Sequence, residues 1–476
     1  MTMLITILIY FGCLFFLSRL VVGKDSNEAF FSANRKSPWY MVAFGMIGAS
    51  ISGVTFVSVP GMVLSCQMTY LQTCLGFIVG YIIVAFVLLP VYYRYRQATI
   101  YAYLRRRFGQ MAYKTGASFF LLSKMTGSAV KFFVVCMILQ RFVFDAYHVP
   151  FVVTVVLLVL LIWFYTRDGG IKTLVWTDTF QTLCLFVALL LIIFKVVETL
   201  QLTPAEAFIA ITKHPDSRVF VFDDWVSTQN FWKQFLSGIF IVIVMTGLDQ
   251  DMMQKNLTCK TLREAQKDMC TYGVAFLPAN MLFLALGILL VMLANKEGVV
   301  LPVKGDELML MYAAGGKLGP VVTILFAIGI VAACFSSADS ALTSLTTTYC
   351  VDIRQRPDDE QLRKRSHWVI AFLFALFIIG FQLVNSTSLL DAIYTLVGYT
   401  YGPLLGLFAF GLLTHRKVHD AWTPVVCVLS PVLCWGIEQV TMFLWAYRCG
   451  HELLLLNGIL TMTGLFLCSR SEKECP

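Results

Sequence analysis

The sequence predicts an all-α integral membrane protein with about 13 transmembrane helices. Hydrophobic residues make up 58% of the chain and charged residues only 13%, and a protein folded in water cannot bury that much apolar surface. Apolar runs of about 18 or more residues, the length that a helix needs to cross a bilayer, recur along the sequence. Because lipid offers no partner to unpaired backbone groups, such a chain folds as a helical bundle.

The expected spans follow one another along the chain with mostly short connections. They lie near residues 2–22, 39–64, 70–92, 115–139, 148–165, 174–195, 233–249, 268–293, 317–351, 367–386, 389–413, 421–445 and 451–468. The first span lacks a basic start and an Ala-x-Ala-like cleavage site, so we expect a retained helix and not a signal peptide.

The positive charges predict how the bundle is oriented. The net charge is +8, and most Lys and Arg residues fall in connections on one side of the expected bundle, at 24–36, 94–114 (with Arg105, Arg106 and Arg107), 255–267, 354–365 and 416–417. By the positive-inside rule these connections face the cytoplasm, so we expect the N-terminus outside and the C-terminus inside. The basic excess therefore orients the chain in a plasma (inner) membrane and requires no nucleic-acid partner.

Two of the expected spans are interrupted. The first contains "GASISGVTFVSVPG" (Gly48–Gly61), and the second is short and runs into "MTGLDQD" (Met245–Asp251). Paired interrupted helices indicate a transporter with inverted repeats and a site near the bilayer midplane; two continuous but poorly hydrophobic helices are the alternative. In a single domain of residues 1–476 we expect a helix at 1–22, a first repeat at 39–195, an external loop at about 196–232, a second repeat within 233–445 and a last helix at 451–468.

Hydroxyl side chains form a stripe along the span near 317–351. Ser336, Ser340, Ser344 and Thr347 recur at helical spacing, with Asp339 beside them. Polar groups at membrane depth are costly and are functional candidates by default. The stripe indicates ion coordination, and a surface for close helix approach is the alternative.

Asp178 is a further polar candidate, about one turn into an apolar span. Gln181 and Thr182 share its helix face. A lone carboxylate at this depth is expensive unless a cation or hydrogen-bond donors satisfy it. Cation binding is one interpretation, and structural pairing with a lysine is the other.

The interrupted first span offers oxygen ligands. A helix unwound near Ala49–Gly53 frees carbonyl oxygens that its own hydrogen bonds would otherwise use, and such breaks coordinate Na⁺ in transporters. The Ser52 and Thr55 hydroxyls could hold a polar solute. Lys124 and Lys131 are seven residues apart and lie on one helix face, within about 20°; they could bind an anionic substrate, snorkel, or pair with a neighbouring Asp.

Several function classes lack their motifs. HExxH, P-loop and GxSxG patterns are absent, so a metalloprotease or an ATP-driven pump has no support. The sequence contains no nucleophile–base pair or metal-ligand set that would indicate a membrane enzyme. The 14 cysteines are scattered without regular spacing, as apolar filler would be.

Four stretches in this order resemble the sodium:solute symporter family, which includes sugar, proline, iodide and sialic acid carriers. Within about residues 30–415 they are "GASISGVTF" (Gly48–Phe56), "YAYLRRRFG" (Tyr101–Gly109), "YTRDGGI" with "WTDTFQ" (Tyr165–Gln181) and "FSSADSALTSLTTTYCVDI" (Phe335–Ile353). The resemblance implies a leucine-transporter-type fold: two inverted five-helix repeats with broken first helices, one extra N-terminal helix and two extra C-terminal helices.

The resemblance also implies ion and substrate sites. The main Na⁺ would be held by backbone oxygens of Gly48, Ile51 and Ala333 and by the hydroxyls of Ser336 and Ser337. A second Na⁺, present in some members, would use Asp178, Ser336, Asp339 and Ser340, although sialic acid carriers have serine at the position of Asp339. The substrate-binding candidates are Ser52, Thr55, Phe56, Lys124 and Lys131.

The hexose-binding positions of sugar carriers hold Val54, Thr55 and Val242 here, which disfavours a galactose-like site. We therefore predict a Na⁺-coupled symporter, not an enzyme, that acts as a monomer. It would import a small polar organic solute by alternating access, preferably a sialic acid or another sugar acid; neutral sugars, amino acids and other carboxylates are alternative substrates. A proton-coupled carrier with Asp178 or Asp339 as proton site, and a transporter-like solute sensor, are the functional alternatives.

Overall fold

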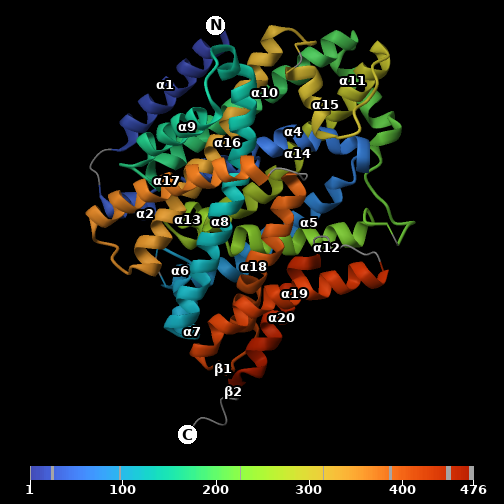
Figure 1. The fold of residues 1–476 in the computed structure, drawn as a ribbon. Coiled ribbons are helices and arrows are strands. Elements are labelled where there is room, and N and C mark those ends of the chain that lie inside the picture. Colours follow the sequence, from blue (N-terminus) through green and yellow to red (C-terminus); the bar gives the residue numbers. More distant parts are fainter. Residues whose placement is uncertain are drawn as a thin grey trace.

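The chain folds almost entirely into helices (Figure 1). The structure, a computed structural model, describes residues 2–22, 26–95, 98–225, 227–314, 316–384, 389–445 and 452–470. Within these residues the only sheet is a short antiparallel pair, β1 (Lys417–Val418) with β2 (Ser469–Arg470). The predicted all-α class is confirmed.

Twenty α-helices carry the fold through the described residues. The first half of the chain forms α1 (Thr2–Val22), α2 (Asn27–Ser32), α3 (Trp39–Ser50), α4 (Gly53–Cys66), α5 (Tyr70–Ile83), α6 (Leu89–Tyr95), α7 (Ala102–Arg107), α8 (Gln110–Leu139), α9 (Phe151–Thr166), α10 (Ile171–Leu200) and α11 (Pro204–Lys213). The second half forms α12 (Phe231–Val242), α13 (Gln250–Asn256), α14 (Leu262–Glu297), α15 (Asp306–Met309), α16 (Pro320–Thr348), α17 (Glu360–Val384), α18 (Leu389–Leu413), α19 (Thr423–Trp445) and α20 (Glu452–Leu467). π-helical turns extend α12 to Gly247 (η6, Ile243–Gly247) and α16 to Ile353 (η8, Tyr349–Ile353).

The helices overlap all of the expected spans. Among the described residues, seven helices are long and apolar enough to cross a membrane, or nine when each of two bent pairs counts as one span. Four shorter apolar helices cover the remaining expected spans: Ile5–Val21, Phe151–Thr166, Gly398–Leu413 and Leu453–Leu467. Parts of the expected spans 367–386 and 451–468 lie outside the described residues, and the count of 13 spans stays a prediction.

Both predicted interruptions are present as sharp bends. The pair Trp39–Ser50 and Gly53–Cys66 is bent by 64°, and the pair Phe231–Gly247 and Gln250–Asn256 by 72°. The alternative of two continuous helices is therefore excluded.

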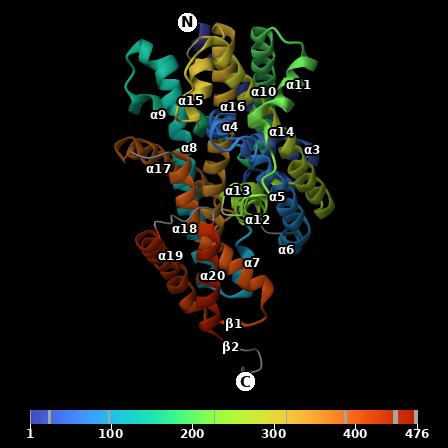
Figure 2. The same ribbon diagram turned by 90° about the vertical axis from the view of Figure 1, so that its right-hand side faces the viewer.

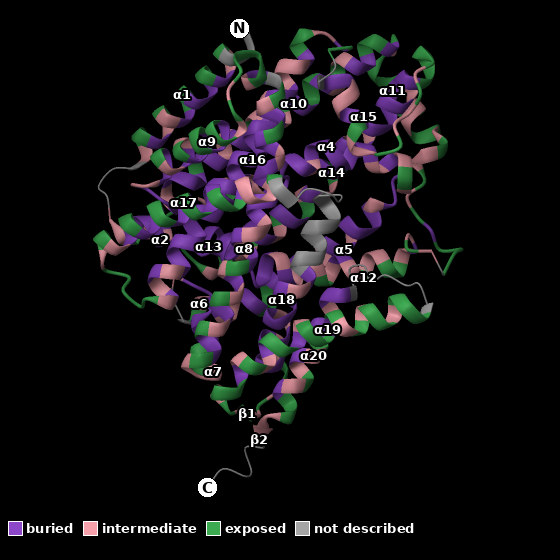
Figure 3. Cartoon of the chain, viewed as in Figure 1, coloured by how far each residue is buried: buried purple, intermediate pink, exposed green. Residues whose placement is uncertain are grey.

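Burial separates a packed interior from an apolar outer surface. Helix α16 runs through the interior between α8 and α10 (Figures 1 and 2), and it also contacts α4, α13 and α17. Buried residues concentrate around it, whereas exposed residues cover the outer helices such as α19 (Figure 3). On α19 the large apolar side chains of Val428, Val432 and Trp435 are exposed, as expected for a helix in contact with lipid tails.

The segment Ala98–Ile100 is tied to two helices by a buried network. Gln250 at the start of α13 donates to the carbonyl of Ala98 (2.8 Å) and accepts from the amide of Ile100 (2.9 Å). Asp352 in η8 accepts from the hydroxyls of Thr99 (2.5 Å) and Tyr113 (2.8 Å). The network therefore fixes part of the connection that is predicted to be cytoplasmic.

Candidate ion and solute site

The break between α3 and α4 releases backbone oxygens from the helical ladder. In a continuous helix the carbonyl of Gly48 would accept from the amide of Ser52, but that amide donates to Ser50 O at 3.1 Å. The carbonyl of Ile51 would accept from the amide of Thr55, which donates instead to the Ser52 hydroxyl at 3.4 Å. Ser52 thus acts as the N-cap of α4, and the two carbonyls predicted to bind Na⁺ have lost their helical donors.

Helix α16 lies directly against this break. The Ser337 hydroxyl donates to Ala49 O at 3.0 Å and approaches Ala333 O in its own helix at 3.3 Å. The neighbouring Ser336 hydroxyl donates to Asp178 Oδ1 at 2.7 Å. The structure therefore brings Gly48–Ile51 and Ala333–Ser337 together, as the predicted main ion site requires.

The chemistry of this donor set suits Na⁺. A hard cation takes oxygen ligands, and the break offers neutral carbonyls beside two hydroxyls. Both hydroxyls give their protons to other acceptors, Ser336 to Asp178 and Ser337 to Ala49, so their lone pairs are free to face a cation. The assignment of Gly48, Ile51, Ala333, Ser336 and Ser337 as ligands stays a prediction.

Asp178 forms a buried ion pair with a residue that the sequence analysis missed. Lys255 Nζ lies 2.7 Å from Asp178 Oδ2, and the two side chains are 2% and 1% exposed. The sequence predicted a cytoplasmic connection at 255–267, but Lys255 lies in α13, where the broken second span continues as a buried helix. No local signal marks it, because Lys255 follows the break within the mostly polar stretch Gln250–Asn256.

Asp339, another member of the predicted second ion site, has hydrogen-bond donors of its own. Asp339 Oδ2 accepts from the Tyr165 hydroxyl at 2.6 Å, and Asp339 Oδ1 accepts from the Ser340 amide at 2.6 Å. The structure thus joins Asp178 to Ser336, whereas it directs Asp339 toward α9.

A cavity of about 380 Å³ opens beside the ion site, between the two broken helices and α8. Its wall includes Ala49 and Ser337 from the ion site and four of the five predicted substrate residues: Ser52, Thr55, Lys124 and Lys131. The fifth, Phe56, does not line it. Phe56 is fully buried and packs against Phe283 and Phe326, because it points to the opposite side of α4 from the cavity.

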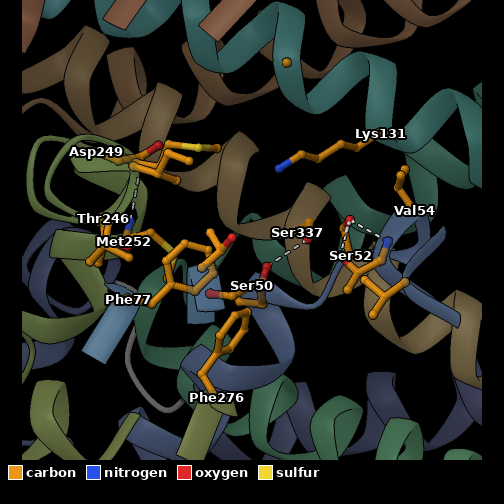
Figure 4. Close-up of a pocket in the computed structure, with 18 of the residues that line it drawn as sticks. Ser50, Ser52, Val54, Phe77, Lys131, Thr246, Asp249, Met252, Phe276 and Ser337 are labelled. Atoms are coloured by element: carbon orange, nitrogen blue, oxygen red, sulfur yellow. Dashed lines mark hydrogen bonds between the residues drawn. The ribbon is translucent and has the colours of Figure 1, made fainter. Parts of the chain in front are cut away.

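The two lysines of α8 have different partners in this cavity. Lys124 Nζ lies 3.1 Å from Asp249 Oδ2 and 2.7 Å from Asp251 Oδ2, and Asp249 also accepts from the Tyr401 hydroxyl at 2.6 Å. Lys131 extends into the open space opposite Ser50, Ser52 and Ser337 (Figure 4). Of the predicted alternatives, pairing with an Asp holds for Lys124. No salt-bridge partner of Lys131 is found among the described residues.

A model of the sodium:solute symporter family matches residues 30–420, which include both broken helices and α16. The chain belongs to this family. The symporter is therefore a multi-pass membrane transporter that couples a small solute to Na⁺, and it is not an enzyme.

Relatives of the symporter include two bacterial carriers. It is 24% identical to the sodium/sialic acid symporter NanT of Aliivibrio fischeri over 459 residues, which cover 92% of this chain and 88% of that protein. It is 25% identical to the sodium/sialic acid symporter SiaT of Proteus mirabilis over 433 residues, covering 86% and 84%.

The fold is that of a solved relative. A Na⁺-coupled sialic acid symporter in a substrate-bound outward-open state matches with a TM-score of 0.83 and 18% identity over 99% of both chains. The symporter thus has the leucine-transporter-type fold that its sequence predicted.

Proposed function

We propose that the symporter imports a small acidic organic solute together with Na⁺, preferably a sialic acid or another sugar acid. The observation that carries this proposal is the side chain of Lys131, which lies in the cavity without an acidic partner among the described residues. An ammonium in a partly dry cavity favours a carboxylate. The Ser50, Ser52 and Thr55 hydroxyls across the cavity offer hydrogen bonds to a polyol, and the sialic acid carriers among its relatives support this choice.

The Na⁺ ion would sit where the first broken helix meets α16, held by Gly48, Ile51, Ala333, Ser336 and Ser337. Bound there, it would supply a positive charge that holds α3, α4 and α16 together. Ala49 and Ser337 form part of both the break region and the cavity wall. The affinity of the cavity for a solute would therefore depend on whether the ion is bound. Coupling requires such a difference in affinity between the two states.

The membrane, orientation and assembly of the symporter are proposals as well. We propose a plasma (inner) membrane location with the N-terminus outside and the C-terminus inside, repeats at 39–195 and within 233–445, and a monomer in contact with lipid as the transport unit. Figure 1 supports the orientation, because α11 of the expected external loop and the arginine-rich α7 lie on opposite sides of the molecule. The solute cavity between them fits alternating access.

Uptake into proteoliposomes tests the ion site and the solute class together. We expect a Na⁺ gradient to drive uptake of a sugar acid in preference to a neutral sugar or an amino acid. The double variant Ser336→Ala/Ser337→Ala should lose Na⁺-dependent uptake and Na⁺-induced thermal stabilisation, because it removes two of the five proposed ligands.

The matched control is Ser344→Ala, which deletes a buried hydroxyl on the same helix that bonds only locally, to Ala341 O at 3.0 Å. It should retain both Na⁺ responses. Retained Na⁺ dependence in the double variant would contradict the ion site, and uptake driven by a pH step in Na⁺-free buffer would favour proton coupling.

A further inference from the structure

The second ion site implied by the family resemblance already contains a positive charge. Its only carboxylate outside α16, Asp178, is bound on both oxygens: Oδ1 accepts from Ser336 at 2.7 Å and Oδ2 lies 2.7 Å from Lys255 Nζ. A carboxylate buried at membrane depth requires a cation or donors. Here a side chain meets that requirement, so the residues present do not fit a second Na⁺.

The other acid of that site is also satisfied without an ion. Asp339 accepts from the Tyr165 hydroxyl and from the Ser340 amide, both at 2.6 Å. Tyr165 occupies one oxygen and the backbone occupies the other. A second Na⁺ would therefore meet a carboxylate that already has its donors, and it would have to displace the ammonium of Lys255 from Asp178.

The backbone around Lys255 is anchored so that its ammonium stays in this place. The preceding Gln254 donates to Phe31 O and to the Thr347 hydroxyl of α16, both at 2.8 Å. The following Asn256 donates to Asp268 Oδ2 of α14 at 2.7 Å. Lys255 itself is 2% exposed, so its ammonium lies away from bulk water.

We propose that Lys255 provides the cation of the second site as a permanent part of the protein, so that the symporter carries one Na⁺ per solute. This proposal rests on the Na⁺ site proposed above at Gly48–Ile51 and Ala333–Ser337. An ammonium and a Na⁺ ion carry the same charge, and the ammonium differs in never leaving the protein during transport. The buried ion pair thus fixes the coupling ratio.

Two measurements on the wild type test the ratio. The ²²Na⁺-to-solute flux ratio in proteoliposomes should be about one. The slope of unfolding free energy against the logarithm of Na⁺ concentration, which grows with each ion bound only by the folded state, should correspond to one ion. A ratio of two with a two-ion slope overturns the proposal while leaving Na⁺ coupling intact; no Na⁺ response at all overturns the proposed ion site itself.

The variant Lys255→Met tests the role of the ammonium. It leaves Asp178 without a cation, so we expect thermal stability to become strongly dependent on Na⁺ and the slope to rise from one ion to two. The exposed Lys260 on the following connection gives the control, because Lys260→Met removes a charge from the same segment and should keep a one-ion slope. A one-ion slope in Lys255→Met would contradict the proposal.

A second variant covers the case in which Lys255→Met does not fold. Lys255→Met/Asp178→Asn removes both charges of the pair and restores neutrality, so we expect a folded protein with a one-ion slope at any Na⁺ concentration. A two-ion slope in this neutral double variant would show that the second ion does not depend on Asp178 and would overturn the proposal.

Discussion

Lys124 and Lys131 project from the same face of α8 but have different surroundings, one acidic and one uncharged. Lys124 faces two carboxylates, Asp249 and Asp251, and so connects α8 to the break between α12 and α13. Lys131, two helical turns later, faces serine hydroxyls across the cavity (Figure 4). One lysine therefore holds the scaffold, and the other remains available to a solute.

This difference predicts separate effects of two substitutions on α8. Lys131→Met should raise the KM for an acidic solute by about 10- to 100-fold, the loss expected for a hydrogen bond to a charged group worth about 1.5–3 kcal/mol. Lys131→Arg should retain most of the affinity, because a guanidinium also binds a carboxylate. Uptake kinetics measure both.

The control is Lys124→Met, which should lower thermal stability with or without solute because it leaves Asp249 and Asp251 buried without their cation. An unchanged KM for acidic solutes in Lys131→Met would show that this ammonium does not bind the carboxylate.

Single residues were predictable where the free-energy cost of a polar group in an apolar segment identified them. Asp178, Ser336 and Ser337 are polar groups in apolar segments, and that cost pointed to a site before any geometry was known. Lys255 was missed because its assignment depended on where a short span ends. Phe56 was misplaced because the sequence alone does not show which face of α4 meets the cavity, and tertiary packing sets that face.

At the level of helices, glycine has a packing role that the sequence analysis did not foresee. In the sequence, the glycines of the first interrupted span indicate an unwound segment. A Cβ atom on Gly48 would lie 1.9 Å from Thr182 Oγ1 and 3.1 Å from the backbone Cα of Thr182. Gly48 thus lets α3 lie against α10, which carries Asp178.

Gly48→Ala should accordingly destabilise the symporter by about 1–3 kcal/mol, the cost typical of overpacking a closely packed contact. Thermal unfolding in detergent measures this, and we expect a lower Tm both with and without Na⁺. Gly436→Ala on the outer helix α19 is the control, since a Cβ there meets nothing within 4 Å and alanine is the better helix former. Equal Tm values for the two variants would contradict the packing argument.

The long helices and both breaks followed from hydropathy and from the clustering of glycine and hydroxyl residues. Short elements outside the membrane did not follow in the same way. Helix α11 has a complete capping box between Thr203 and Glu206, a local signal that was present in the sequence. The β1–β2 pair joins residues about 50 positions apart, so no local pattern could have predicted it.

Across the whole molecule, the cavity borders the connection expected to be external, whereas the buried network around Ala98–Ile100 lies on the side expected to be cytoplasmic. The cavity wall includes Gln229 and Gln234, just before and within α12, next to the connection expected to be external. On the expected cytoplasmic side, Gln250 and Asp352 hold the segment Ala98–Ile100 in place. We expect these contacts to close the cytoplasmic side and to stabilise a state that receives Na⁺ from outside.

Weakening that closure should shift the whole protein toward the opposite state. Gln250→Leu removes two hydrogen bonds and leaves the carbonyl of Ala98 and the amide of Ile100 without their partner. Each unsatisfied buried group costs about 1–3 kcal/mol of stability. We expect faster hydrogen exchange at residues 98–104 and a higher apparent Kd for external Na⁺, because fewer molecules are competent to bind it. Gln361→Leu, on the exposed start of α17, should change neither, and unchanged exchange in Gln250→Leu would contradict the assignment of a closure.

A lysine fixed beside Asp178 has an electrical consequence for the cell. If one Na⁺ enters with each singly charged acid, a full cycle moves no net charge across the bilayer. The membrane voltage, which would otherwise contribute about 2.3 kcal/mol per ion at 100 mV, then does no work on uptake. Accumulation would be limited by the sodium concentration ratio alone, and depolarising the cell would leave the accumulation ratio of the acid unchanged.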